Sequence, residues 1–117
     1  MENIGKSQTV IVDCITLLIN NIILPYSDET REHVDAALAE KAVIAEIGEL
    51  NDCIDQVKAN FIIVTNDVGL GLVPADSLSR LYRDLLGKAN QMLAQRADKV
   101  YFMVAGIPLQ IKPATTR

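Results

Sequence analysis

Three short runs of apolar, mostly β-branched residues predict β-strands at Thr9–Val12, Phe61–Val64 and Val100–Ala105. None of these runs alternates between apolar and polar positions, so we expect each strand to be covered on both faces. Helical patterns separate the runs. Strands of this kind, alternating with helices, are typical of a parallel sheet with helices on both faces, and we predict this α/β architecture.

Helical spacing of apolar residues predicts three helices. The first runs over Ile15–Leu24 and is stopped by Pro25. Ser27 or Asp28 can cap the second, which is expected to reach about Lys58, and Pro74 fits the first turn of the third. The predicted core positions are Val43, Ile47, Leu50, Ile54 and Val57 in the second helix and Leu78, Leu81, Tyr82, Leu85, Leu86, Ala89 and Leu93 in the third.

The length of 117 residues allows one small domain, residues 1–117, with an ordered core expected over about residues 9–112. A net charge of −4 with 4% aromatic residues disfavours a nucleic-acid-binding function. The most apolar stretch, Val10–Leu24, is interrupted by polar residues and is too short to predict a membrane span. The cysteines, Cys14 and Cys53, lack metal-ligand spacing and indicate buried, reduced thiols, so we expect a cytoplasmic protein.

Ligands of parallel α/β sheets bind outside the carboxyl ends of the strands. This rule selects Asp13, the Thr65–Asn66–Asp67 segment and Gly106 as candidate site positions. An acid that follows four apolar strand residues is placed to hold Mg²⁺ directly or through water. Asp13 could equally cap the following helix through hydrogen bonds to backbone N–H groups, and the sequence leaves both interpretations open.

Other polar residues carry weaker signals. Asn66 and Asp67 could orient a phosphate-bound water or a substrate hydroxyl, or serve only the turn toward Gly69. His33, the only histidine, is expected to be a solvated residue of the acidic second helix. Arg80 and Arg83 lie opposite the apolar face of the third helix, so they are either simply exposed or directed at a ligand or a neighbouring subunit.

Several blocks of this sequence, taken in their order along the chain, resemble one family. They are Val12–Leu17 (VDCITL), Val64–Pro74 (VTNDVGLGLVP), Arg83–Gln91 (RDLLGKANQ) and Ala105–Leu109 (AGIPL). The family is the bifunctional adenosylcobinamide kinase/adenosylcobinamide-phosphate guanylyltransferase of cobalamin biosynthesis. The likeness extends in order from about residue 9 to residue 112.

The resemblance implies a RecA-like P-loop fold with ATP, GTP and Mg²⁺ as cofactors or substrates. It implies phosphorylation of adenosylcobinamide by a nucleoside triphosphate, then transfer of GMP from GTP through an enzyme histidine to the cobinamide phosphate. It also implies a trimeric homo-oligomer. By position, Asp13 matches the family's nucleotide- and Mg²⁺-associated acid, and Thr65, Asn66 and Asp67 fall in its nucleotide-side motif. Family members commonly have Glu where this chain has Asp67.

The resemblance also implies a missing part, because the family's phosphate loop and guanylylated histidine lie upstream of the strand that ends at Asp13. The chain is therefore expected to be the C-terminal part of the family's domain, without a catalytic residue of its own and inactive alone. Two alternatives stay open at this point. One is a non-catalytic subunit or degenerate paralogue that binds a protein partner, and the other is a small regulatory module outside the family.

Overall fold

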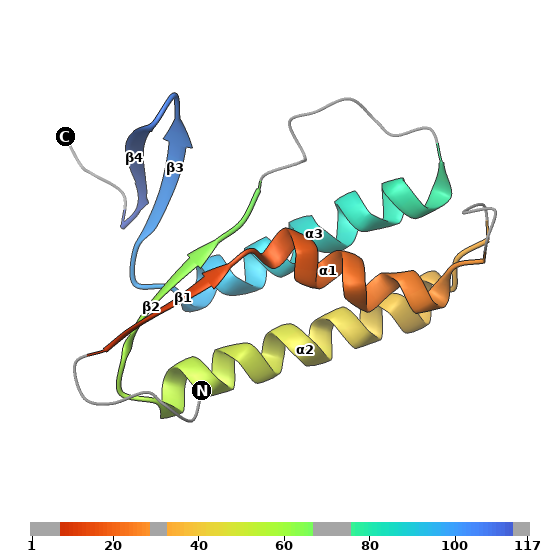
Figure 1. The fold of residues 1–117 in the computed structure, drawn as a ribbon, viewed down its shortest axis with the longest axis horizontal. Coiled ribbons are helices and arrows are strands. Elements are labelled where there is room, and N and C mark those ends of the chain that lie inside the picture. The colour runs from red at the N-terminus through yellow and green to blue at the C-terminus, as the bar shows by residue number, and fades with distance from the viewer. Residues whose placement is uncertain (1–7, 29–32, 67–75, 114–117) are drawn as a thin grey trace.

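The computed structural model describes residues 8–28, 33–66 and 76–113 (Figure 1). Its elements, in chain order, are β1 (Thr9–Asp13), α1 (Ile15–Ile23), the short 3₁₀ turn η1 (Leu24–Tyr26), α2 (Ala36–Gln56), β2 (Asn60–Val64), α3 (Ser77–Arg96), β3 (Val100–Val104) and β4 (Ile107–Lys112). Asp67, Gly69 and Pro74 lie outside the described residues. The chain is thus an α/β structure with helices between its successive parallel strands.

β1 and β2 form a parallel pair, as the sequence predicts. The register joins Thr9 to Asn60 at one end and Asp13 to Val64 at the other. Exposure alternates along both strands, and the inward residues Val12 and Ile63 pack against the helices. The prediction that these strands are covered on both faces is wrong for the described residues. The outward face carries Ile11, which is 65% exposed, and Ile62, which is 52% exposed.

The three helices lie alongside one another and enclose the core (Figure 1). Apolar spacing predicts five of the seven α3 core positions, and Val43 and Ile47 of α2, because helix faces that repeat every three or four residues are those that meet. It is wrong at the end of α2, where Leu50 is only partly buried and Ile54 and Val57 lie outside the core. Fully or nearly fully buried residues are Ile15, Ile19 and Ile23 of α1, Ala39, Val43 and Ile47 of α2, and Leu78, Leu85, Leu86, Ala89 and Leu93 of α3. Exposed ion pairs, Lys88–Glu40 at 2.6 Å and Arg96–Asp55, join α3 to α2 but add little stability.

The start of the second helix differs from the prediction. α2 begins at Ala36, where the side chain of Asp35 caps the helix by accepting a hydrogen bond of 3.2 Å from the backbone N–H of Leu38. Ser27 instead forms an isolated antiparallel bridge with Val34. Ser27, Asp28 and Asp35 are all cap-type residues, so residue type alone could not select among them. His33 consequently lies before the helix and not in it.

The third predicted strand is not part of the parallel sheet in the described structure. β3 pairs antiparallel with β4, a strand that the sequence reading missed. The turn between them is made by Ala105 and Gly106, with φ of 52° and 76°. Positive φ at both central residues is the geometry of a tight hairpin turn, which glycine favours. Gly106 is therefore a turn residue, and the prediction that it marks a strand end at a binding edge is wrong.

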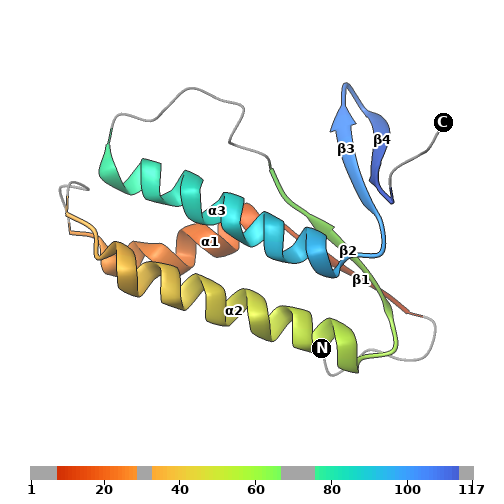
Figure 2. The ribbon, with the colours of Figure 1, turned by 180° about the vertical axis from the view of Figure 1, so that it is seen from behind.

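Lys112 ties this hairpin to the end of α3. Its ammonium group donates to the backbone carbonyl oxygens of Ala94 at 2.8 Å and Gln95 at 2.9 Å. Carbonyls in the last turn of a helix lack partners within the helix and carry its negative dipole end, so a lysine there is stabilising. In both Figure 1 and Figure 2 the hairpin stands apart from the β1–β2 pair.

We predict that Leu86→Ala lowers the free energy of unfolding by about 2–5 kcal/mol, since Leu86 is fully buried among the helices. Leu38→Ala is the matched control, because Leu38 is a helical leucine that is 50% exposed, and it should cost less than about 1 kcal/mol. Urea unfolding followed by circular dichroism measures both. Equal losses for the two variants would contradict the helix packing described here.

Candidate functional site

Asp13 lies at the carboxyl end of β1, opposite Val64 of β2, and its side chain is exposed. The residue that caps α1 is Cys14, and that cap makes no side-chain hydrogen bond. Within the described ranges, the Asp13 carboxylate has no hydrogen bond or ion pair. Of the two interpretations that the sequence left open, the helix cap is therefore wrong.

Thr65 and Asn66 follow β2 directly, so the parallel register places them at the same edge as Asp13. A residue of α3 holds them there. The Thr65 hydroxyl donates to Asn90 Oδ1 at 2.6 Å, and Asn90 Nδ2 donates to the backbone carbonyl oxygen of Asn66 at 2.9 Å. Asn90 thus fixes the chain just beyond the strand by two hydrogen bonds. We call Thr65, Asn66 and Asn90 the β2 corner.

Sequence reasoning did not select Asn90. It lies within the Arg83–Gln91 block that carries the family resemblance, but it is one polar helix position among several. Its role appears only when α3 is packed beside the end of β2. Asp67 lies outside the described residues, and Arg83 pairs with its neighbour Asp84 at 3.2 Å.

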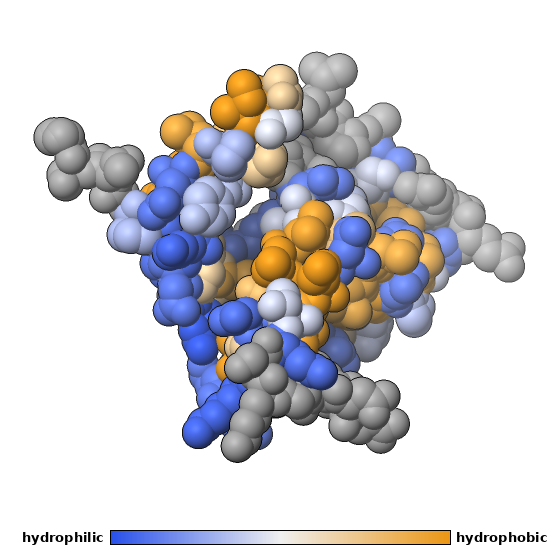
Figure 3. Space-filling model, turned by 60° about the vertical axis from the view of Figure 1, so that its left-hand side comes forward, coloured by the Kyte–Doolittle hydropathy of each residue, from blue (hydrophilic) through white to orange (hydrophobic). Residues whose placement is uncertain are grey.

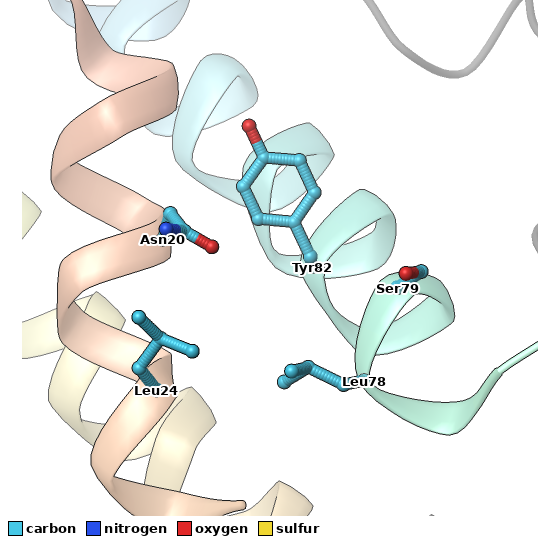
Figure 4. Close-up of a pocket in the computed structure, with 5 residues that line it drawn as sticks. All are labelled: Asn20, Leu24, Leu78, Ser79 and Tyr82. Carbon is cyan, nitrogen blue, oxygen red and sulfur yellow. The ribbon is translucent and has the colours of Figure 1, made fainter. Parts of the chain in front are cut away.

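A separate cavity of about 360 Å³ lies between α1 and the first turns of α3 (Figure 4). Its lining residues are Asn20, Leu24, Leu78, Ser79 and Tyr82. The Tyr82 hydroxyl donates to the backbone carbonyl oxygen of Thr16 at 3.3 Å, and burial raises the pKa of this phenol. None of the candidate site residues lines the cavity, so it is distinct from the β1–β2 edge.

By their side chains and helix lengths alone, the described residues form neither a metal site nor a membrane span. Across residues 8–28, 33–66 and 76–113, no three His, Cys, Asp or Glu side chains cluster closely enough to form a metal site by themselves. In the same ranges, no helix has the length and apolar character needed to cross a membrane. Cys14 and Cys53 are unpaired, and both are half-buried where the sequence predicted full burial.

The chain is an α/β domain with polar residues where two parallel strands end, and this is the edge at which ligands of such sheets generally bind. Comparison with known proteins gives the family. Residues 1–111 match the model of the CobU family, described as cobinamide kinase / cobinamide phosphate guanyltransferase. The chain belongs to this family, as the sequence blocks suggested, and the interpretation as a regulatory module outside it is wrong.

Individual relatives agree with this assignment. The chain is 35% identical over 111 residues to proteins of Escherichia coli and Salmonella typhimurium named bifunctional adenosylcobalamin biosynthesis protein CobU. It is 34% identical over 105 residues to the Pseudomonas aeruginosa protein CobP, which has the same descriptive name. The first two matches cover 94% of this chain and 61% of each relative. The chain therefore spans less than two thirds of the length of these relatives.

We predict that Asp13→Ala changes the free energy of unfolding by no more than about 0.5 kcal/mol, because the carboxylate has no partner among the described residues to lose. Asp35→Ala, which removes the cap of α2, should cost about 0.5–2 kcal/mol. Urea midpoints of the two variants compare them directly. A loss at Asp13 as large as that at Asp35 would mean that Asp13 serves the fold.

Proposed function

We propose that this chain supplies one wall of the nucleotide site of a cobinamide kinase/cobinamide-phosphate guanylyltransferase. In the proposed reactions, a nucleoside triphosphate phosphorylates the hydroxyl of adenosylcobinamide, and GMP then passes from GTP to the resulting phosphate. Family membership and the names of the relatives support this assignment. The observation that carries it in this chain is the Asp13 carboxylate, which has no partner among the described residues and lies at the edge where Thr65 and Asn66 also lie.

Asp13 is proposed to bind the Mg²⁺ that accompanies the nucleotide. Mg²⁺ prefers oxygen ligands and is commonly held by one or two carboxylates together with phosphate oxygens and water. A single carboxylate without a partner among the described residues fits that mode. When bound, the ion would offset the negative charge of the triphosphate.

Thr65 and Asn66, together with Asp67, are proposed to contact the nucleotide on the β2 side of the site. The two hydrogen bonds of Asn90, one accepted from Thr65 and one donated to Asn66, support this, because they hold the binding groups in place before the ligand arrives. A fixed backbone at the strand end loses little conformational entropy on binding. These contacts would position the substrates, whereas a nucleophilic histidine is proposed to come from a polypeptide segment outside this chain.

Exposed apolar surface favours the involvement of further polypeptide. Apolar side chains gather on the side of the molecule that carries the two strand pairs (Figure 3). On the outward face of the parallel pair Val64 is 42% exposed, and in the hairpin Met103, Ile107 and Leu109 are 57%, 69% and 58% exposed. Apolar patches and unpaired strand edges of this kind mark interaction surfaces. We propose that this face packs against more of the same enzyme, either its remaining part or further subunits.

For the chain alone, we predict self-association and no turnover of GTP. The uncovered apolar faces should drive association, and the phosphate-binding loop that the reaction needs is proposed to lie elsewhere. Size-exclusion chromatography with light scattering measures the first property, and GTP consumption in the presence of cobinamide measures the second. A compact monomer that turns over GTP would contradict this proposal.

A chimaera tests the function itself. We predict that this chain, fused to the part of the Escherichia coli relative that it does not match, restores cobinamide-dependent growth to cells lacking that enzyme. Asp13→Ala in the chimaera should lower the kinase rate by at least about 10- to 100-fold, the loss that is typical even for residues that only support a metal ligand. Asp52→Ala is the matched control, since Asp52 is an exposed acid of α2 distant in sequence from the site.

Failure of the chimaera has a defined meaning. If the chimaera is soluble and folded but does not support growth, the chain is a non-catalytic paralogue and the proposed function is wrong. Equal activity of the Asp13→Ala and Asp52→Ala variants would leave the family assignment intact and would remove Asp13 from the nucleotide site.

A further inference from the structure

In the β2 corner, the donor and the acceptor of each hydrogen bond made by Asn90 can be assigned. Asn90 Nδ2 lies 2.9 Å from the backbone carbonyl oxygen of Asn66. A carbonyl oxygen can only accept, so the amide nitrogen of Asn90, and not its oxygen, must face Asn66. The two ends of a side-chain amide are opposite in character. The orientation of the whole Asn90 amide group is therefore determined by this single contact.

The second contact of Asn90 follows from the first. With its nitrogen at Asn66, Asn90 presents Oδ1 to the Thr65 hydroxyl, at a distance of 2.6 Å. An amide oxygen can only accept, so the single hydroxyl proton of Thr65 is used in this bond. What Thr65 offers to any ligand is then its lone pairs alone. Thr65 is an exposed residue of the described structure.

This arrangement limits what Thr65 can bind. We infer that Thr65 Oγ1 is a fixed acceptor for an electropositive group of the ligand, either a divalent cation or an N–H or O–H donor, and that it does not contact a phosphate oxygen. Asn90 is the positioning residue that sets this polarity. The inference rests on the proposed function and refines it, since it assigns Thr65 to a part of the nucleotide complex other than the phosphates.

The neighbouring groups are of the same kind. Asp13, at the end of the adjacent strand, offers a carboxylate without a partner in the described structure. The Asn66 carbonyl also accepts and retains a second lone pair. The side chains of Asp13 and Thr65 and the Asn66 carbonyl thus present acceptors, which attract cations and donors, whereas the uncapped first turn of α1 offers backbone N–H groups to anions. Phosphate binding at Thr65 would require breaking the bond to Asn90.

Hydrogen–deuterium exchange of the full chain tests the inference and does not depend on catalysis. Three probes are added separately: Mn²⁺ alone, guanosine alone and inorganic phosphate alone. We expect Mn²⁺ or guanosine to slow exchange in the segment Phe61–Asn66, and phosphate to leave it unchanged. Protection by Mn²⁺ identifies the ligand group that Thr65 accepts from as a cation, and protection by guanosine identifies it as an uncharged hydrogen-bond donor.

Variants separate positioning from folding. Thr65→Val, which is isosteric and lacks the hydroxyl, should weaken binding of the protecting ligand by about 3- to 10-fold, and Thr65→Ser should retain the binding of the unsubstituted chain. Asn90→Leu should weaken it similarly. Gln91→Leu, the same change at the next and exposed position of α3, should have no effect. The urea midpoint of each variant shows whether its fold is retained.

Three results would overturn the inference: protection of the segment by phosphate, protection by none of the probes, or full binding by Thr65→Val. These outcomes are distinguishable from failure of the proposed function. A chimaera that supports growth while phosphate protects Phe61–Asn66 would retain the function and refute the inference. A chimaera without activity, together with cation or guanosine protection, would do the opposite.

Discussion

The parallel pairing of β1 with β2 is the contact on which the rest of the structure depends. Its register, Asp13 opposite Val64, brings together chain segments separated by about fifty residues of sequence and makes their carboxyl ends coincide. A slip of one residue would turn every side chain of a strand to the other face, so that Ile63 would leave the core and Ile62 would enter it. The helices pack only against the inward face, and this fixes the register.

The helix layer also prepares the edge of the sheet. α3 contributes both to the core, through Leu86 and Ala89, and to the β2 corner, through Asn90 at the next position. A position fixed by buried apolar contacts thus holds an exposed pair of hydrogen bonds in place. The opposite face of the sheet has no such support from the described chain, which agrees with relatives that are longer than the matched region.

Much of the helix packing could be predicted from the sequence, because the helical periodicity of apolar residues indicates which face of a helix is buried. Leu78, Leu85 and Leu93 are core residues by spacing and by structure. The partner of a strand was harder to predict from the sequence. The apolar run Val100–Val104 has the same pattern whether it joins a parallel sheet or a hairpin, and only the Ala105–Gly106 turn distinguishes the two. The β2 corner could not be predicted from the sequence, since no local pattern marks Asn90 as a partner of Asn66.

We propose that the carboxyl edge of the β1–β2 pair faces a bound nucleotide. Photoaffinity labelling of the chimaera with an azido analogue of GTP, followed by mass-spectrometric mapping of the labelled residues, tests it most directly. We predict that label falls in this chain within the segments around Asp13 and around Thr65–Asn66, and that unlabelled GTP prevents it. Competed label confined to the outer surface of α2 or to the β3–β4 hairpin would contradict the account.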